Sequence, residues 1–136
     1  VSCAPVDSKQ EEIAVFKLEE IDPWLVSISG NKPSEINVEG KWHDHESVGM
    51  VKFKFSGWGE GQIYQNGNNL SGVIGSYNVR GIVSAKTVFA VFYADGIVHY
   101  TIKMKMIERG VLEGQYFDAD EKNQLNGYYV RLIIDR

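Results

Sequence analysis

The chain contains few cysteines, prolines and histidines: one, three and three, respectively, among 136 residues. Because Cys3 has no second cysteine to pair with, no intrachain disulfide can form, and a disulfide-built secreted scaffold is excluded. Long apolar runs are also missing, and no uncharged apolar stretch approaches the ~20 residues that a membrane-spanning helix needs. With only three histidines, candidates for a general base are few.

Positive charge is sparse and dispersed. The formal net charge is −4, and the lysines stand singly along the chain. A clustered positive field that could neutralise phosphates is therefore not expected, and nucleic acid is not a predicted partner. Hydrophobic residues make up 43% and charged residues 24%, as in an ordinary globular protein. A chain of this length is sufficient for one domain with its own core.

The lone cysteine lies close to the first residue. Val1 and Ser2 precede Cys3, an order that resembles the end of a bacterial lipoprotein signal, in which small residues precede a cysteine that becomes lipidated. This resemblance implies an exported lipoprotein of the periplasm or outer membrane, attached to the membrane only through a lipid on Cys3. Residues 1–9 would then be a tether and residues 10–136 a single domain. The alternative is an incidental thiol.

Residues 72–106 give the strongest structural signal. Val98, Tyr100, Ile102 and Met104 alternate with polar residues, which is the period of a strand with one buried face. An Asp-Gly pair at residues 95–96 separates this run from the apolar run before it, and this pair is a strong hairpin signal. The segment is therefore predicted to be an antiparallel meander.

Strand and turn signals continue over most of the chain. The predicted strands are 37–43, 49–56, 59–65, 71–78, 80–84, 88–94, 98–107, 111–118 and 126–134. Eight or nine short strands without intervening helices predict an all-β fold, either an up-and-down antiparallel barrel or a β-sandwich. We favour the barrel, because closure removes the exposed edges of so wide a sheet.

One helix is expected before the strands. Residues 8–11, Ser-Lys-Gln-Glu, have the form of a capping box, and Asp22-Pro23 is expected to end the helix. The strand at 88–94 is apolar on both faces. Its outward row, Phe89, Val91 and Tyr93, is therefore expected to meet this helix or a second subunit of a homodimer.

The sequences at the start and at the end of the strand region resemble those of the calycin group, which includes lipocalins, fatty-acid-binding proteins and avidins. Gly40-Lys41-Trp42 resembles the Gly-x-Trp of the first lipocalin strand, and residues 127–131 form a final Gly-Tyr-Tyr-Val-Arg strand. The resemblance covers residues 40–131 at the level of the fold. It implies that Trp42 lies at the closed end of a barrel and that Arg131 covers it. Alternation instead places Arg131 on the face opposite Val130.

A metal site is a weaker hypothesis. His43 and His45 are two residues apart, so a strand would direct both imidazoles to one side, as in cupin-type sites. The glutamate that a cupin site requires is missing, since Gly49 and Met50 stand at its place. If Trp42 points inward, both histidines point outward. We therefore expect no cofactor and no enzymatic activity, with a metal-dependent enzyme as the remote alternative.

Aromatic residues on the predicted inner face suggest a ligand site. The candidates are Trp42, Phe53, Phe55, Tyr77, Tyr100, Tyr116 and Tyr128. They could line a cavity for a small apolar or aromatic ligand, or they could fill the barrel as a solid core. The first alternative predicts a non-enzymatic binding protein. The second predicts a structural or protein-interaction module that engages a protein partner through its surface.

Overall fold

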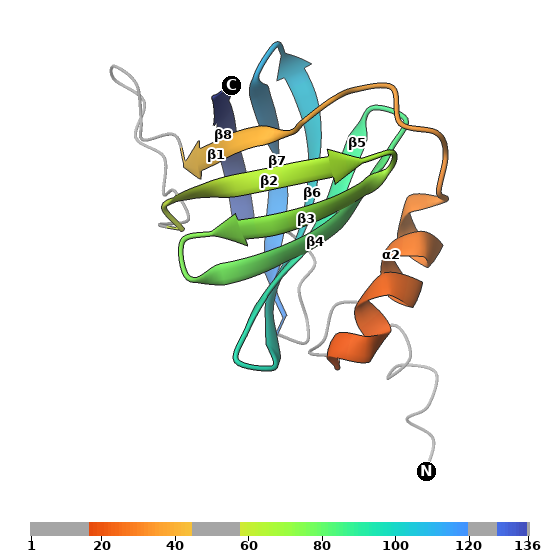
Figure 1. Cartoon of the computed structure of the whole chain (residues 1–136), viewed down its shortest axis with the longest axis vertical. Coiled ribbons are helices and arrows are strands. Elements are labelled where there is room, and N and C mark those ends of the chain that lie inside the picture. Colours follow the sequence, from red (N-terminus) through yellow and green to blue (C-terminus); the bar gives the residue numbers. More distant parts are fainter. Residues whose placement is uncertain (1–16, 45–57, 120–127, 136) are drawn as a thin grey trace.

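The computed structural model describes residues 17–44, 58–119 and 128–135 (Figure 1). The strands are β1 (Gly40–Asp44), β2 (Glu60–Asn66), β3 (Asn69–Ile74), β4 (Tyr77–Ser84), β5 (Thr87–Ala94), β6 (Ile97–Glu108), β7 (Val111–Asp118) and β8 (Tyr128–Asp135). They are preceded by a 3₁₀ turn, η1 (Leu18–Glu20), and a helix, α2 (Ile21–Ser29). The predicted strand at 49–56 lies outside the described residues.

The strands form a closed antiparallel barrel in which each strand pairs with the next one along the chain. β8 closes the barrel by pairing with β1, with Trp42 opposite Ile134. The predicted up-and-down barrel is confirmed with eight strands, and the sandwich alternative is wrong. The Asp-Gly hairpin is also confirmed: Asp95 and Gly96 both have positive φ, and Ala94 pairs with Ile97 across the turn.

A turn divides the predicted strand at 71–78. β3 ends at Ile74 and β4 begins at Tyr77. The predicted continuous strand at 71–78 is therefore wrong, and so is the predicted start of the next strand at residue 80. Gly75 has a φ of 57°, and a Cβ added there would lie 1.9 Å from the carbonyl oxygen of Trp58. Only glycine tolerates this combination of positive φ and close backbone approach. In the sequence, Gly75 and Ser76 stand between apolar residues, a pattern that is also compatible with a continuous strand.

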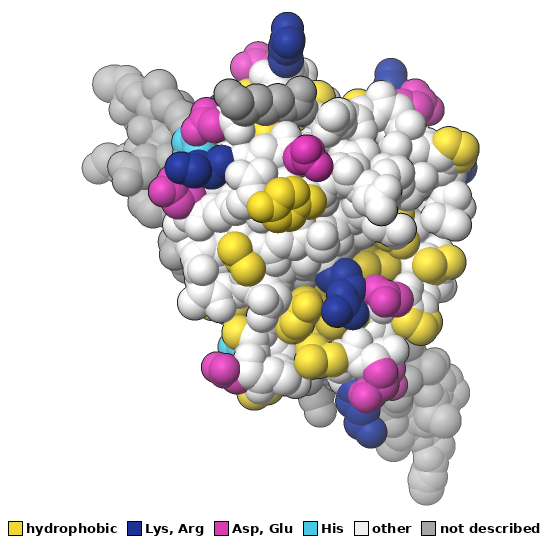
Figure 2. Space-filling view, viewed as in Figure 1, with side chains coloured by type: hydrophobic (Ala, Val, Ile, Leu, Met, Phe, Trp, Pro, Cys, Tyr) yellow, Lys and Arg dark blue, Asp and Glu magenta, His cyan; other side chains and the backbone are white. Residues whose placement is uncertain are grey.

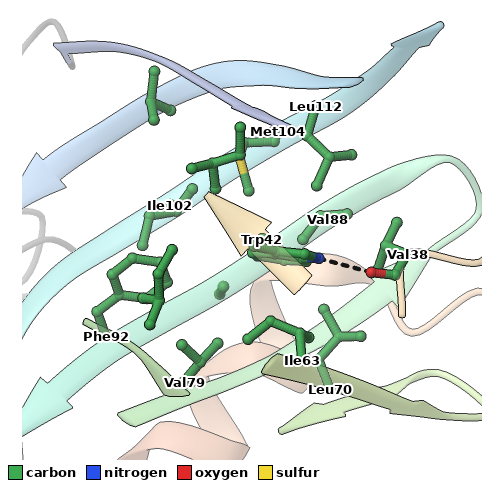
Figure 3. Packing of buried hydrophobic residues seen from close by; sticks show 14 of the residues in the cluster. Val38, Trp42, Ile63, Leu70, Val79, Val88, Phe92, Ile102, Met104 and Leu112 are labelled. Atoms are coloured by element: carbon green, nitrogen blue, oxygen red, sulfur yellow. Dashed lines mark hydrogen bonds between the residues drawn. The ribbon is translucent and has the colours of Figure 1, made fainter. Parts of the chain in front are cut away.

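The interior of the barrel is filled by side chains around Trp42, whose exposed fraction is 0% (Figure 3). The indole Nε1 donates a hydrogen bond to the carbonyl oxygen of Val38 at 2.7 Å, so the polar atom of this side chain is satisfied within the core. Apolar side chains from most of the strands pack with it: Ile63, Leu70, Ile74, Val79, Val83, Val88, Phe92, Ile102, Met104, Leu112, Val130, Leu132 and Ile134.

A β-bulge in β6 changes which side chains point inward. Phe92 pairs with Tyr100, but the next residue, Tyr93, pairs with Val98, so His99 is the extra residue of the bulge. Tyr100, Ile102 and Met104 face the interior as predicted. Val98 instead belongs to a second apolar cluster, outside the barrel, so the prediction that it shares their face is wrong.

This second cluster lies between α2 and the outer face of the sheet. Ile21 and Leu25 of α2 pack with Phe89 and Val91 of β5 (Figure 1). The prediction that the outward apolar row meets the N-terminal helix is confirmed. None of the helices among the described residues is long and apolar enough to cross a membrane.

The predicted end of the helix at Asp22-Pro23 is wrong, and its predicted start at Ser8 lies outside the described residues. α2 begins at Ile21, so Pro23 lies in its first turn instead of ending it. Backbone N–H groups in the first turn have no acceptor within the helix, so a proline there removes no hydrogen bond. The helix ends at Gly30, which has a left-handed φ of 73°.

Polar contacts hold both ends of α2 against the barrel. Near its start, Asp22 lies 3.6 Å from the guanidinium of Arg80, which also lies over the ring of Tyr93. Near its end, the Ser84 hydroxyl donates to the carbonyl oxygen of Ser29 at 2.8 Å. On the face shown in Figure 2, apolar side chains gather beside α2 around a basic and an acidic side chain. The helix is therefore packed against the outside of the barrel as part of the same domain.

Leu25 and Val26 provide a matched test of this packing. Leu25 is 1% exposed and Val26 is 47% exposed on the same helix. Leu25→Ala is expected to lower the free energy of unfolding by about 2–5 kcal/mol, because it leaves a cavity against β5. Val26→Ala is expected to change it by no more than about 0.5 kcal/mol. Urea denaturation measures both, and equal losses would show that α2 does not bury Leu25 against the sheet.

Candidate functional site

Four of the seven predicted ligand residues meet at one end of the barrel. Tyr77 is on β4, Tyr100 on β6, Tyr116 on β7 and Tyr128 on β8. We call these four residues the tyrosine cluster. Trp42 does not belong to it, because Trp42 lies in the filled part of the interior. Phe53 and Phe55 lie outside the described residues.

Strand register brings the cluster together. Tyr116 pairs with Ile102 on one side and with Tyr128 on the other, so inward-facing side chains of three adjacent strands share one level of the barrel. The ring centroids are 5.5 Å apart for Tyr77 and Tyr100, 5.4 Å for Tyr100 and Tyr116, and 5.3 Å for Tyr116 and Tyr128. The four rings therefore form one continuous chain of contacts.

Trp58, which was not among the predicted residues, joins the cluster to the core. Its ring centroid lies 5.0 Å from Tyr116, 5.4 Å from Tyr100 and 4.5 Å from Phe92. Trp58 stands just before β2, so strand alternation does not assign it to either face. The only sequence signal is its position between two glycines. Alternation with Val98 and Tyr100 would place His99 on the wet face of its strand, but the bulge places its ring 5.3 Å from Tyr77.

The tyrosine cluster extends from the core to the surface. Tyr116 is 8% exposed, Tyr77 and Tyr100 are half-buried, and Tyr128 is 39% exposed. A ligand could thus contact ring faces and hydroxyl groups without displacing the packed core below them. Aromatic surfaces with a few polar tips are typical of sites for small apolar molecules.

The pKa of the Tyr100 hydroxyl, within the cluster, is shifted from its ordinary value. Its pKa is raised to about 12, chiefly by burial and then by a hydrogen bond with Tyr77. Both effects favour the neutral phenol over the phenolate. At neutral pH Tyr100 therefore presents an uncharged hydroxyl group beside its ring.

The arginine implied by the calycin resemblance does not cover Trp42. Arg131 lies on the outer face of β8, between the buried Val130 and Leu132, and its Nε is 4.0 Å from Glu113 on β7. The correspondence of Arg131 with the lipocalin arginine is therefore wrong. Alternation along β8 gives this side chain the opposite face, and no bulge intervenes in its pairing with β7.

Of the two proposed metal ligands, the structure describes His43. His43 is half-buried, and its Nε2 lies 3.1 Å from Asp135 on the neighbouring strand. His45 lies outside the described residues. Within residues 17–44, 58–119 and 128–135, no group of three or more histidine, cysteine, aspartate or glutamate side chains could hold a metal ion.

Two surface depressions formed by described residues lie away from the predicted aromatic residues. One, of about 380 Å³, crosses the outer wall of β6 and β7 at Lys103, Lys105 and Phe117. The other, of about 420 Å³, lies beside residues 34–37 and Gln65. The Gln65 side chain is already used to hold this segment, since its amide accepts from the Val38 N–H and donates to the Ile36 carbonyl. Neither depression includes a residue of the tyrosine cluster.

Alkaline titration tests the environment of Tyr100. Its pKa of about 12 lies above the ordinary value of 10.0, so the folded state retains a proton that the unfolded state loses. The resulting contribution to stability is full below pH 10 and is lost between pH 10 and pH 12. Tyr129 also has a pKa of about 12, owing to burial and then its hydrogen bond with Glu113. Difference absorbance should show one fewer late-titrating tyrosine in Tyr100→Phe than in the native chain. A Tyr100 that titrates with the exposed tyrosines would contradict this geometry.

Comparison with protein-family models, curated proteins and solved structures found no match to this chain. What the structure shows is an eight-stranded antiparallel barrel with Trp42 packed inside it. A conclusion about function has to be drawn from the barrel and the tyrosine cluster themselves.

Proposed function

We propose that the protein is a non-enzymatic binding protein that holds a small apolar or aromatic ligand at the tyrosine cluster. The supporting observation is that four inward-facing tyrosines from four strands form one chain of ring contacts at one end of the barrel. Tyrosine supplies a large contact area at low conformational cost, together with a hydroxyl that can orient a ligand.

The packing limits where the ligand can bind. Trp42, Ile63 and Met104 are fully buried within the described barrel, and the space around them is occupied by other apolar side chains. A ligand at that level would have to replace packed side chains, which costs several kcal/mol for one large residue. We therefore place the ligand above this level, against Tyr77, Tyr100 and Tyr128.

The cellular setting is part of this proposal. The barrel architecture agrees with a calycin-like carrier, a class in which closed antiparallel barrels bind small molecules. The small residues before Cys3 support export and attachment to a membrane through a lipid. The binding domain would then be held near the membrane of the periplasm or the outer membrane by the tether of residues 1–9.

A second candidate is a protein-interaction module with a solid barrel. The filled interior favours it, because such a barrel needs no ligand for its stability. The outward row first considered for this role, Phe89, Val91 and Tyr93, packs against α2. A protein partner would therefore have to bind elsewhere. The surface that includes Tyr128 is a candidate, and it overlaps the proposed ligand site.

Tyr128 and Tyr129 allow a direct test. They are adjacent, each is 39% exposed, and they lie on opposite faces of β8. Indole is a suitable small aromatic probe, with binding measured by chemical-shift changes or calorimetry. Tyr128→Ala is expected to weaken indole binding about fivefold, by removal of one stacking surface of about 1 kcal/mol.

Tyr129→Ala is the matched control and is expected to leave indole binding unchanged, because Tyr129 bonds to Glu113 on the outer wall. If the native chain binds neither indole nor any member of a small-molecule panel in thermal-shift measurements, the carrier proposal is wrong. Equal effects of the two substitutions would place the ligand somewhere other than the tyrosine cluster.

A further inference from the structure

The depression of about 380 Å³ on the outer wall lies where β6 and β7 approach each other closely. Gly114 of β7 is one of its lining residues, and a Cβ added there would overlap the carbonyl oxygen of Lys103 on β6. Only a residue without a side chain fits this approach. Gly114 therefore contributes only backbone, and the side chains of the neighbouring residues border the depression.

Two of these bordering side chains are lysines of β6. Lys103 and Lys105 alternate with Ile102 and Met104, which are buried in the barrel, so both lysines project from the outer wall and are exposed. Residues two positions apart on one strand are separated by about 7 Å. Both ammonium groups, on flexible stems, can therefore reach one bound group.

The carboxylate opposite these lysines is engaged on its other side. Glu113 pairs with Lys105 across β6 and β7, but its side chain accepts a hydrogen bond from Tyr129 and lies 4.0 Å from Nε of Arg131, both on β8. Among the described residues, neither lysine of the depression lies within ion-pair distance of a carboxylate. The ring contact that Lys103 makes with β5 leaves its charge unneutralised. Two positive charges thus border the depression without a counterion from the described chain.

Apolar surface lies beside these charges. The half-buried Phe117 of β7 lines the same depression, one row along the strands from the Lys103–Gln115 pair. The methylene stems of the lysines add further apolar surface below their charged ends. The Gln115 amide can also donate a hydrogen bond to an anionic group. The depression therefore combines an apolar end with a positively charged end.

From these observations we infer that the depression between β6 and β7 is a second binding site, which takes a small organic anion with its charged group at Lys103 and Lys105 and its apolar body against Phe117. The site lies on the outer wall, apart from the tyrosine cluster, and does not depend on the proposed function. Because the whole chain has a formal net charge of −4, the binding of an anion depends on this local pair of charges.

Three probes separate charge from apolar contact: 2-naphthoate, 2-naphthalenemethanol and acetate. The alcohol keeps the rings without the charge, and acetate keeps the charge without the rings. At low salt, 2-naphthoate is expected to bind the native chain about fivefold more tightly than the alcohol, the scale of two exposed lysine–carboxylate pairs, and more tightly than acetate. Chemical-shift titration measures all three affinities and should show the shifts on β6 and β7. Equal affinities for 2-naphthoate and either of the other two would overturn the inference.

Substitution of the lysines tests the charged end. Lys105→Gln is expected to weaken 2-naphthoate binding about twofold, and Lys103→Gln combined with Lys105→Gln about fivefold, with the alcohol unaffected. Lys41→Gln is the control, because Lys41 lies on β1, beyond β8, and pairs with Glu60. It should leave both affinities unchanged. An equal loss in Lys41→Gln and Lys105→Gln would mean that net charge and not the depression attracts the anion, and the inference would be wrong.

Gln115→Glu places a carboxylate opposite Lys103 with almost no change of shape. Gln115 is exposed, so this variant is expected to fold as the native chain does. The new carboxylate competes for the lysines, and 2-naphthoate binding should weaken about fivefold. A native affinity for 2-naphthoate in Gln115→Glu would overturn the inference.

Tyr128→Ala separates this site from the tyrosine cluster. If Tyr128→Ala weakens 2-naphthoate binding and the lysine substitutions do not, the anion binds at the tyrosine cluster and the inference is wrong, while the proposed function stands. If 2-naphthoate responds to the lysine substitutions and no probe binds at the tyrosine cluster, the inference stands and the proposed function is wrong.

Discussion

The structure depends on filling the interior of a closed eight-stranded barrel. A barrel of this size is just wide enough to be packed by its own side chains, and Trp42 supplies the largest of them. Burying an indole leaves one N–H group to satisfy, and the Val38 carbonyl accepts it within the core. Because Trp42 and its neighbours occupy the middle of the barrel, the described inward-facing aromatic residues that remain near the surface are Tyr77, Tyr100 and Tyr128, farther along the strands.

The same sheet supports a second apolar cluster on its outside. β5 is buried on both faces, with Phe92 in the barrel and Phe89 and Val91 under α2. This double burial explains why one strand of an otherwise alternating sequence is apolar throughout. It also removes the apolar row of β5 from the surfaces that a partner could use. The tyrosine end of the barrel remains as a candidate binding surface.

Much of the fold could be predicted from local chemistry. The alternation in β6, the Asp95-Gly96 turn and the two-sided apolar strand predicted the meander, its closure and the helix packed outside. The same alternation selected Tyr77, Tyr100, Tyr116 and Tyr128 as inward-facing residues. It could not show which level of the barrel each would occupy, because that depends on the register between strands and not on any one strand.

The errors have specific physical causes. Pro23 was read as a helix terminator, although proline is equally compatible with a first turn. The bulge at His99 shifts Val98 to the outer cluster by a change in pairing that a single strand does not reveal. Trp58 precedes its strand and owes its position to tertiary packing against Phe92 and Tyr116. The bulge depends on pairing between two strands, and the position of Trp58 depends on packing against residues distant in the sequence.

The central claim is that the barrel is solid around Trp42, and the stability of Trp42→Ala tests it most directly. If Trp42 is packed on all sides, its removal leaves a cavity and lowers the free energy of unfolding by about 3–5 kcal/mol in urea denaturation. Tyr64→Ala, at an exposed position on β2, provides the reference for a large aromatic residue outside the core. A loss below about 1 kcal/mol for Trp42→Ala would mean that Trp42 borders open space, and the ligand would then belong inside the barrel.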